Sequence, residues 1–414
     1  MITGIFARET SISNEEGIHD CAQLLLAEVI TQALAKNCSY SLYVAERGIT
    51  AKDVIFALER QGYVRPDIAE DSEKRTIYCV DMHEPLMLLH NLDTTIKEPF
   101  ASSPLILEQI EKNHKRLQLA LTKLYPGNLV VSLSSAVMHH RLVDRITSLN
   151  GVPKEPLVPR KLGDNMCVPF GKILRGKVVP NTVTKTLHTD KVYEPDLNSY
   201  TIEPFPFYSP LESQIKMIQS FERPVILVDD LVHKADRLQV LEPSLREANI
   251  PIKKVVVGVI SGYGRDLMQS LNLPVEAVYS MPNLRQWFVE STLYPFIGGD
   301  TVRRDEFEVA GLQPSVNMIL PYATPKLSGC SREALYELSA CCIENSRDLF
   351  RLLESEYRRQ FAKNLTLSRL SEAIILPLIP DKGSCMDYDE NLAASVYLDN
   401  DLEMLGRMKE FMLD

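Results

Sequence analysis

Four apolar segments that alternate with helical patterns constrain the fold of this chain more than any other feature. The segments are NLVVSLS (128–134), VILV (225–228), KKVVVGVI (253–260) and VEAVYS (275–280). Strands whose apolar residues run on without polar alternation are buried on both faces, as in parallel sheets. Helices between such strands cover the two faces of the sheet. The sequence therefore predicts an α/β fold with a parallel sheet flanked by helices.

Two segments with other patterns flank this central part. Residues 1–100 alternate short helical and strand patterns, which predicts a small N-terminal α/β segment. The residues after 325 carry long helical patterns, which predict a helical C-terminal appendage. A chain of 414 residues has room for two or three domains. We predict three segments, which span 1–100, 101–325 and 326–414.

Composition excludes several classes of protein. The formal net charge of −10 argues against a nucleic-acid partner held by its phosphates. No apolar run approaches the roughly 20 residues that span a bilayer, and the sequence MITGIFARET has no signal-peptide pattern. We therefore expect a cytoplasmic protein without a membrane partner. None of the eight cysteines forms a Cys-x-x-Cys pair, so we expect reduced, mostly buried thiols.

An acidic pair, Asp229 and Asp230, directly follows the VILV segment. Ligands of open parallel sheets bind outside the carboxyl ends of the strands. Two carboxylates at such an end can hold sugar hydroxyls or a hydrated Mg²⁺ ion, and the start of the next helix can hold a phosphate. In the alternative interpretation, Asp229 turns the chain and Asp230 caps the next helix.

Basic residues gather in the segment TKTLHTDK (184–191), which contains Lys185, His188 and Lys191. Mobile loops with such residues close over polyphosphates and stabilise charge on the leaving oxygen. In an acidic protein this cluster favours an anionic ligand. The alternative is that these are solvated surface side chains.

The segment VILVDDLVHKADR (225–237) resembles the ribose-phosphate signature of type I phosphoribosyltransferases. Residues 128–140 (NLVVSLSSAVMHH) are similar to the pyrophosphate-binding strand, loop and helix of that family, and residues 170–193 take the place of its mobile catalytic loop and flanking strands. The resemblance implies an Mg²⁺-dependent site for a small ribose phosphate or nucleotide. The implied residues are Asp229 and Asp230 for the ribose hydroxyls or the metal, Lys185 and His188 for catalysis, Ser134 and Ser135 for the pyrophosphate, His233 and Lys234 for the 5′-phosphate, and Lys191 in the closing loop.

The phosphate loop departs from the family pattern. His233, Lys234, Ala235 and Asp236 stand where a glycine-containing loop normally wraps its N–H groups around the phosphate. Two hypotheses follow. The chain is a phosphoribosyltransferase-like enzyme that transfers or releases a phosphoribosyl group, or it is a non-catalytic ligand-sensing or scaffold module.

The N-terminal part carries a second resemblance. The helical pattern of 17–36, the strand SLYVA (41–45) and the segment ITAKDVIFALERQGYV (49–64) are similar to the C-terminal half of a GNAT acyltransferase. LERQGY keeps part of that family's last helix, which implies a partial domain without acyl transfer. The order is similar to that of large bacterial proteins that join nucleotidyltransferase, GNAT-like and phosphoribosyltransferase-like segments. The apolar stripes of the C-terminal helices predict a homodimer.

Overall fold

A computed structural model describes the fold over residues 26–27, 29–34, 36, 38–45, 52–66, 76–159, 161–206, 208–234, 236–304, 309, 311–325, 327–382 and 387–412. The chain forms two compact units. Unit 1 contains the residues up to Ser132 together with Arg285–Asp300 and Arg304–Asp414, and unit 2 contains Leu133–Leu284 and Thr301–Arg303. The three predicted segments stay a prediction.

Unit 2 is built on a five-stranded sheet in the order β10-β9-β8-β4-β5. Every neighbouring pair in it is parallel, which confirms the predicted α/β class. Its strands are β4 (Met166–Pro169), β5 (Val183–Thr184), β8 (Val225–Val232), β9 (Ile252–Ser261) and β10 (Val275–Met281).

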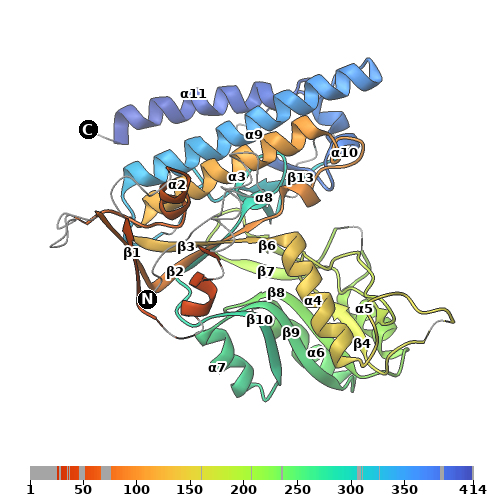
Figure 1. Cartoon of the computed structure of the whole chain (residues 1–414). Coiled ribbons are helices and arrows are strands. Elements are labelled where there is room, and N and C mark those ends of the chain that lie inside the picture. Colours follow the sequence, from red (N-terminus) through yellow and green to blue (C-terminus); the bar gives the residue numbers. More distant parts are fainter. Residues whose placement is uncertain are drawn as a thin grey trace. The chain divides into compact units, whose positions relative to one another are not determined.

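Helices cover both faces of this sheet (Figure 1). Because side chains alternate along a strand, Val225 and Leu227 of β8 point to one face, where they share a core with leucines and isoleucines of α5 and α6. On β9, Gly258 faces Met138 of α4 closely enough that no side chain would fit between them. The helices are α4 (Ser135–Leu149), α5 (Leu211–Gln219), α6 (Asp236–Glu247) and α7 (Gly262–Ser270).

The basic segment predicted as a mobile loop contains regular strands. β6 (Thr189–Tyr193) pairs antiparallel with β7 (Tyr200–Pro204). On its other side β6 pairs in parallel with β12 (Asp300–Val302). These strands give residues 189–193 a fixed backbone.

Unit 1 has a sheet in which β2 (Thr76–His90) is the central strand. It pairs antiparallel with β1 (Tyr40–Ala45) and parallel with β11 (Gln286–Val289). β3 (Asn128–Ser134) also pairs with β2, so the prediction that NLVVSLS belongs to the parallel sheet was wrong. β2 is 15 residues long, so more than two strands can pair with different parts of it. The pairing of β3 with β2 depends on contacts between distant residues, which the local sequence pattern does not reveal.

Long helices form the rest of unit 1. α3 (Pro104–Leu124) packs against α9 (Arg332–Phe361), and α9 packs against α11 (Ala394–Met412) (Figure 1). These contacts confirm the predicted C-terminal helices and include them in the core of unit 1. In the described part of the chain, none of the helices combines the length and the apolar character that a bilayer span requires.

Shorter elements complete unit 1. They are α2 (Lys52–Arg60), η1 (Leu92–Thr94), α8 (Glu290–Leu293), β13 (Gln313–Val316), η2 (Leu367–Arg369), α10 (Leu370–Ala373) and β14 (Leu378–Pro380). In the N-terminal region, 29–34 is helical and SLYVA forms β1, whereas residues 17–25 and 49–51 of the predicted helices lie outside the described residues. The GNAT-like resemblance stays a prediction.

Candidate ligand site at the acidic pair

The acidic pair lies inside strand β8 and not after its end. β8 stays paired with β9 as far as Val232, whereas β4 on the other side ends at Pro169, opposite Val228. Asp229 and Asp230 therefore follow the point where β4 stops. The next helix, α6, begins at Asp236, so the alternative in which Asp230 caps that helix was wrong.

The chain that leaves β4 turns directly onto the two carboxylates. The backbone N–H of Lys172 donates to Oδ2 of Asp230 at 2.6 Å, and that of Ile173 donates to Oδ1 at 3.0 Å. A Cβ atom on Gly171 would lie 2.5 Å from Oδ1 of Asp230 and 2.7 Å from Oδ1 of Asp229. Only glycine can occupy position 171, because any side chain there would collide with the two carboxylates. The absence of a side chain at this position lets both adjacent aspartates face the same loop.

Burial changes the chemistry of Asp229. Its removal from water raises the pKa to about 7, the Arg237 guanidinium opposes that rise, and the neighbouring Asp230 charge adds to it. Nη1 of Arg237 lies 4.0 Å from Oδ1 of Asp229, and that oxygen also accepts the backbone N–H of Asp230 at 2.8 Å. Near neutral pH, Asp229 therefore exists in both protonation states.

Basic residues follow β4 in residues 171–177, here called the basic loop. Arg175 is half-buried, and its Nη2 donates to the carbonyl of Thr189 at 3.0 Å. Burial lowers the pKa of Arg175, while Asp190 and Asp230 both act to raise it. Arg175 thus lies within electrostatic reach of the acidic pair and holds the start of β6 beside it.

His188 and Lys191 are anchored by aromatic side chains. The His188 ring stacks on Tyr208 with centroids 3.8 Å apart, and burial together with Arg175 and Lys185 lowers the pKa of His188. This imidazole is therefore neutral at physiological pH. Lys191 places its Nζ 3.8 Å from the ring centroid of Tyr200. Lys185 is half-buried on the same segment.

The loop after β8 is tied to neighbouring elements. Nδ1 of His233 lies 2.9 Å from the Ser261 hydroxyl, whereas Lys234 is exposed. Asp236 hydrogen-bonds Tyr200, whose pKa is raised by burial and by that carboxylate. Because Lys191 lies over the same Tyr200 ring, the Asp236 carboxylate has a cation nearby. Ala235 lies outside the described residues.

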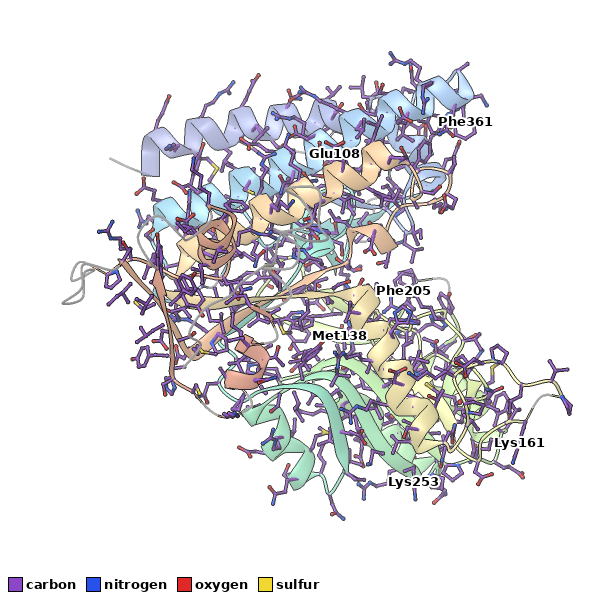
Figure 2. The ribbon with its side chains drawn as sticks, in the orientation of Figure 1. Glu108, Met138, Lys161, Phe205, Lys253 and Phe361 are labelled. Carbon is purple, nitrogen blue, oxygen red and sulfur yellow. The ribbon has the colours of Figure 1, made fainter. Side chains whose placement is uncertain are left out.

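The two predicted pyrophosphate serines stand at the start of α4. Ser134 is exposed, and Ser135 is buried with a hydroxyl that has no hydrogen-bond partner among the described residues. Met138, labelled in Figure 2, meets Gly258 near the end of β9. Both serines therefore lie toward the carboxyl edge of the sheet.

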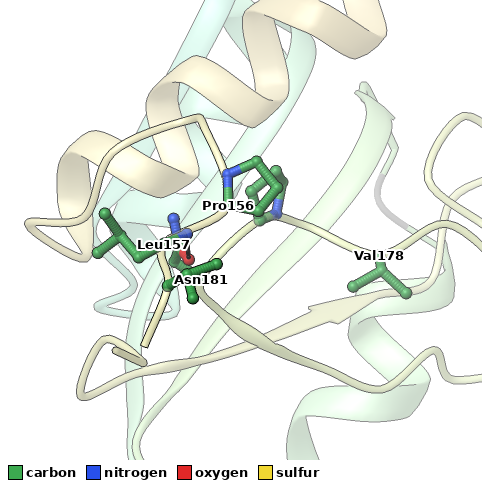
Figure 3. Close-up of a pocket in the computed structure, with 6 residues that line it drawn as sticks. Pro156, Leu157, Val178 and Asn181 are labelled. Carbon is green, nitrogen blue, oxygen red and sulfur yellow. Dashed lines mark hydrogen bonds between the residues drawn. The ribbon is translucent and has the colours of Figure 1, made fainter. Parts of the chain in front are cut away.

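The structure thus gathers most of the predicted residues near the carboxyl edge of one sheet. Sequence reasoning missed Gly171 and Arg237, although a glycine directly after a short apolar run (MCVPFG, 166–171) is a usable signal. A separate pocket of about 450 Å³ has a mostly apolar lining without charged side chains (Figure 3). It is formed by Pro156, Leu157, Val158, Val178, Pro180 and Asn181, and none of the predicted site residues lines it.

No protein-family model matches this chain, and no curated protein is significantly similar to it in sequence.

Proposed function

We propose that the carboxyl edge of the unit 2 sheet binds a phosphorylated ribose or nucleotide, as the phosphoribosyltransferase-like resemblance implies. The observation that carries the proposal is the meeting of Asp229 and Asp230 with the basic loop. Ribose hydroxyls donate to carboxylates, and phosphate oxygens accept from cations and N–H groups. A ligand with both groups needs both kinds of partner side by side.

The parts of the ligand have separate partners in this proposal. The acidic pair receives the ribose hydroxyls, because each carboxylate oxygen can accept a second hydrogen bond besides the backbone one. Ser134 and Ser135 meet a pyrophosphate together with Lys172 and Lys177 from the basic loop, and His233 and Lys234 meet the 5′-phosphate. Arg175 positions the start of β6 through Thr189.

The site geometry favours binding over transfer of the phosphoribosyl group. Transfer passes through a cationic sugar and needs positive charge on the leaving pyrophosphate. His188 is neutral and stacked on Tyr208, and Lys191 lies on an aromatic ring. A ligand-sensing module therefore fits these two residues better than an enzyme does.

The Mg²⁺ ion predicted at Asp229 and Asp230 stays a prediction. Hard cations take several ionised or carbonyl oxygens as ligands. Asp230 gives both oxygens to backbone N–H groups, and the pKa of Asp229 is raised to about 7 by burial. The two aspartates are therefore better suited to accept hydrogen bonds from sugar hydroxyls than to ligate a metal ion directly. In this proposal, Mg²⁺ enters the site bound to the phosphates of the ligand.

Calorimetry on the full chain tests the proposal. Phosphoribosyl pyrophosphate, ribose 5-phosphate and pyrophosphate are titrated with and without Mg²⁺. We expect Asp230→Asn and Lys172→Gln each to raise the Kd at least about tenfold, since each removes a charge-assisted contact. The matched controls are Asp164→Asn, at an exposed residue just before β4, and Lys253→Gln, at an exposed residue near the start of β9 that Figure 2 labels.

Turnover is measured separately as pyrophosphate release in the presence of free nucleobases. Release that Asp230→Asn abolishes supports the enzyme. Binding without release supports the sensing module. If none of the three ligands binds, or if the control variants weaken binding as much as the site variants do, the ribose-phosphate proposal is overturned.

A further inference from the structure

A buried carboxylate in unit 1 lies between two histidines that come from distant parts of the chain. Oε2 of Glu290 is 2.9 Å from Nε2 of His114 and 3.1 Å from Nδ1 of His90. The two imidazole rings lie 4.1 Å apart at an interplanar angle of 33°. One donor atom from each of the three residues lies within 4.8 Å of the other two.

The fold explains why these three residues meet. β11 runs parallel to β2, with Val289 opposite Leu89, so Glu290 and His90 follow at the same level. Asn91 then fixes the start of α8, because its Oδ1 accepts the N–H of Ser291 at 2.9 Å. His114 comes from the long helix α3. Regular elements with their own tethers hold all three groups.

The side chain of Glu290 is completely buried, and Oε2 is shared between the two histidines. Its second oxygen, Oε1, accepts the hydroxyl of Tyr294 at 3.1 Å, and that hydroxyl accepts Nδ2 of Asn345 at 2.8 Å. A buried carboxylate oriented in this way needs positive charge beside it, which either a metal ion or a protonated histidine can supply.

We propose that His90, His114 and Glu290 bind a divalent transition-metal ion, for which zinc is the probe. Two imidazoles and one carboxylate form a donor set that such ions take, with a further position open to water. Nitrogen and oxygen ligand atoms that lie 2.0–2.1 Å from a tetrahedral zinc ion are about 3.3 Å from each other. The two N–O separations at Glu290 are close to that value, so a small approach of the rings completes the site.

In the competing interpretation, no metal binds, and a proton on a histidine forms an ion pair with Glu290. His114 carries that proton, because its hydrogen bonds and charge interactions with Glu111 and Glu290 overcome burial and raise its pKa to about 9. The two interpretations differ in a measurable way. A metal ion binds in a fixed ratio and gives a coordination spectrum, whereas an ion pair does neither. The histidine side chains are 12% and 16% exposed, which leaves a route for the ion.

The experiment uses the chelator-stripped full chain with Cys38→Ser, because Cys38 is an exposed thiol that can itself bind zinc. Zinc affinity is measured by competition with a chromophoric chelator, and Co²⁺ replaces zinc to report the ligand field. We expect one ion per chain and Co²⁺ bands of a nitrogen and oxygen site. Glu290→Gln should weaken zinc at least about 100-fold, since loss of a direct ligand exceeds the effect of its outer partners.

His83→Gln serves as the matched control, because His83 is exposed on the same strand as His90, and it should leave zinc affinity unchanged. Should Glu290→Gln fail to fold, His114→Gln replaces it with the same expected loss. The proposal is overturned if the parent chain binds no zinc, or if the ligand variants bind zinc and shape the Co²⁺ spectrum as the parent does.

Discussion

The backbone N–H of Lys172 donates a hydrogen bond of 2.6 Å to Oδ2 of Asp230. This bond joins the end of β4 to the strand beside it, and the next N–H, that of Ile173, takes the other oxygen of the same carboxylate. Such an approach of backbone to carboxylate requires that the residue before Lys172 has no side chain.

Gly171→Ala should destabilise the protein by about 1–3 kcal/mol, the usual cost of forcing an extra methyl group into a packed site. The new Cβ would stand 2.5 Å from Oδ1 of Asp230, so the basic loop must move. The hydrogen bonds from its backbone N–H groups to Asp230 must then lengthen. Urea unfolding of the full chain measures the change. Gly406→Ala is the control, because a Cβ added at that position of α11 would meet no described atom within 4 Å outside the chain neighbours and backbone of its own helix. It should stabilise the helix by up to about 1 kcal/mol, and equal effects of the two changes would contradict the structure.

Asp229 should make stability fall as pH rises toward neutrality. Its folded-state pKa of about 7 lies above the ordinary value of 3.8, so the folded protein binds the extra proton between these values. The free energy of unfolding therefore decreases through this window and levels off above it. Asp229→Asn removes this dependence, and its stability relative to the parent should improve by about 3 kcal/mol between about pH 5 and about pH 8.

Urea unfolding of both proteins in chelator-containing buffer at the two pH values tests this expectation. The exposed Asp164→Asn variant should follow the parent at both. A difference between Asp229→Asn and the parent that does not change with pH would contradict the assignment of a raised pKa to Asp229.

Arg175→Lys should loosen the start of β6. The guanidinium donates to the carbonyl of Thr189 at 3.0 Å and lies over Phe205, 5.1 Å from the ring centroid, and lysine cannot reproduce that planar geometry. We expect amide hydrogen exchange in residues 188–193 to become about tenfold faster, which corresponds to the loss of one hydrogen bond. Arg223→Lys is the control, because Arg223 also donates to a backbone carbonyl, that of Gly163, which lies outside residues 188–193. This change should leave exchange in 188–193 as it is in the parent. Unchanged exchange in 188–193 would show that Arg175 does not hold this segment.

The sequence was a good guide to features that depend on local pattern. Continuous apolar runs located β8, β9 and β10 and the parallel class of their sheet, because the burial of β8 and β9 on both faces leaves a direct trace in composition. The acidic pair was also recognisable, although β8 runs past it to Val232. The position at which a strand ends depends on its neighbouring strands. Beside Asp229 and Asp230, β9 continues and keeps β8 paired, whereas β4 has already ended.

Features that depend on distant residues were not accessible in the same way. β3 pairs with β2 across more than one helix, and no local periodicity distinguishes that sheet from the parallel one. Glu290 lies 200 residues from His90, so neither residue suggests the other in the sequence. Gly171 differs from other glycines only through the carboxylates that it meets.

Asn113 and Asn345 should be energetically coupled. Both are fully buried, and the side chain of each donates to the backbone carbonyl of the other, at 3.0 Å and 3.2 Å, where α3 packs against α9. Each change to alanine should cost about 1–3 kcal/mol, because it removes a buried side-chain hydrogen bond to the partner helix. The double variant should differ from the sum of the single ones by about 0.5–3 kcal/mol in urea unfolding. Asn113→Ala combined with Gln219→Ala, a change on α5 of unit 2, should be additive. Additivity of the Asn113 and Asn345 changes would mean that the reciprocal bonds do not act as one unit.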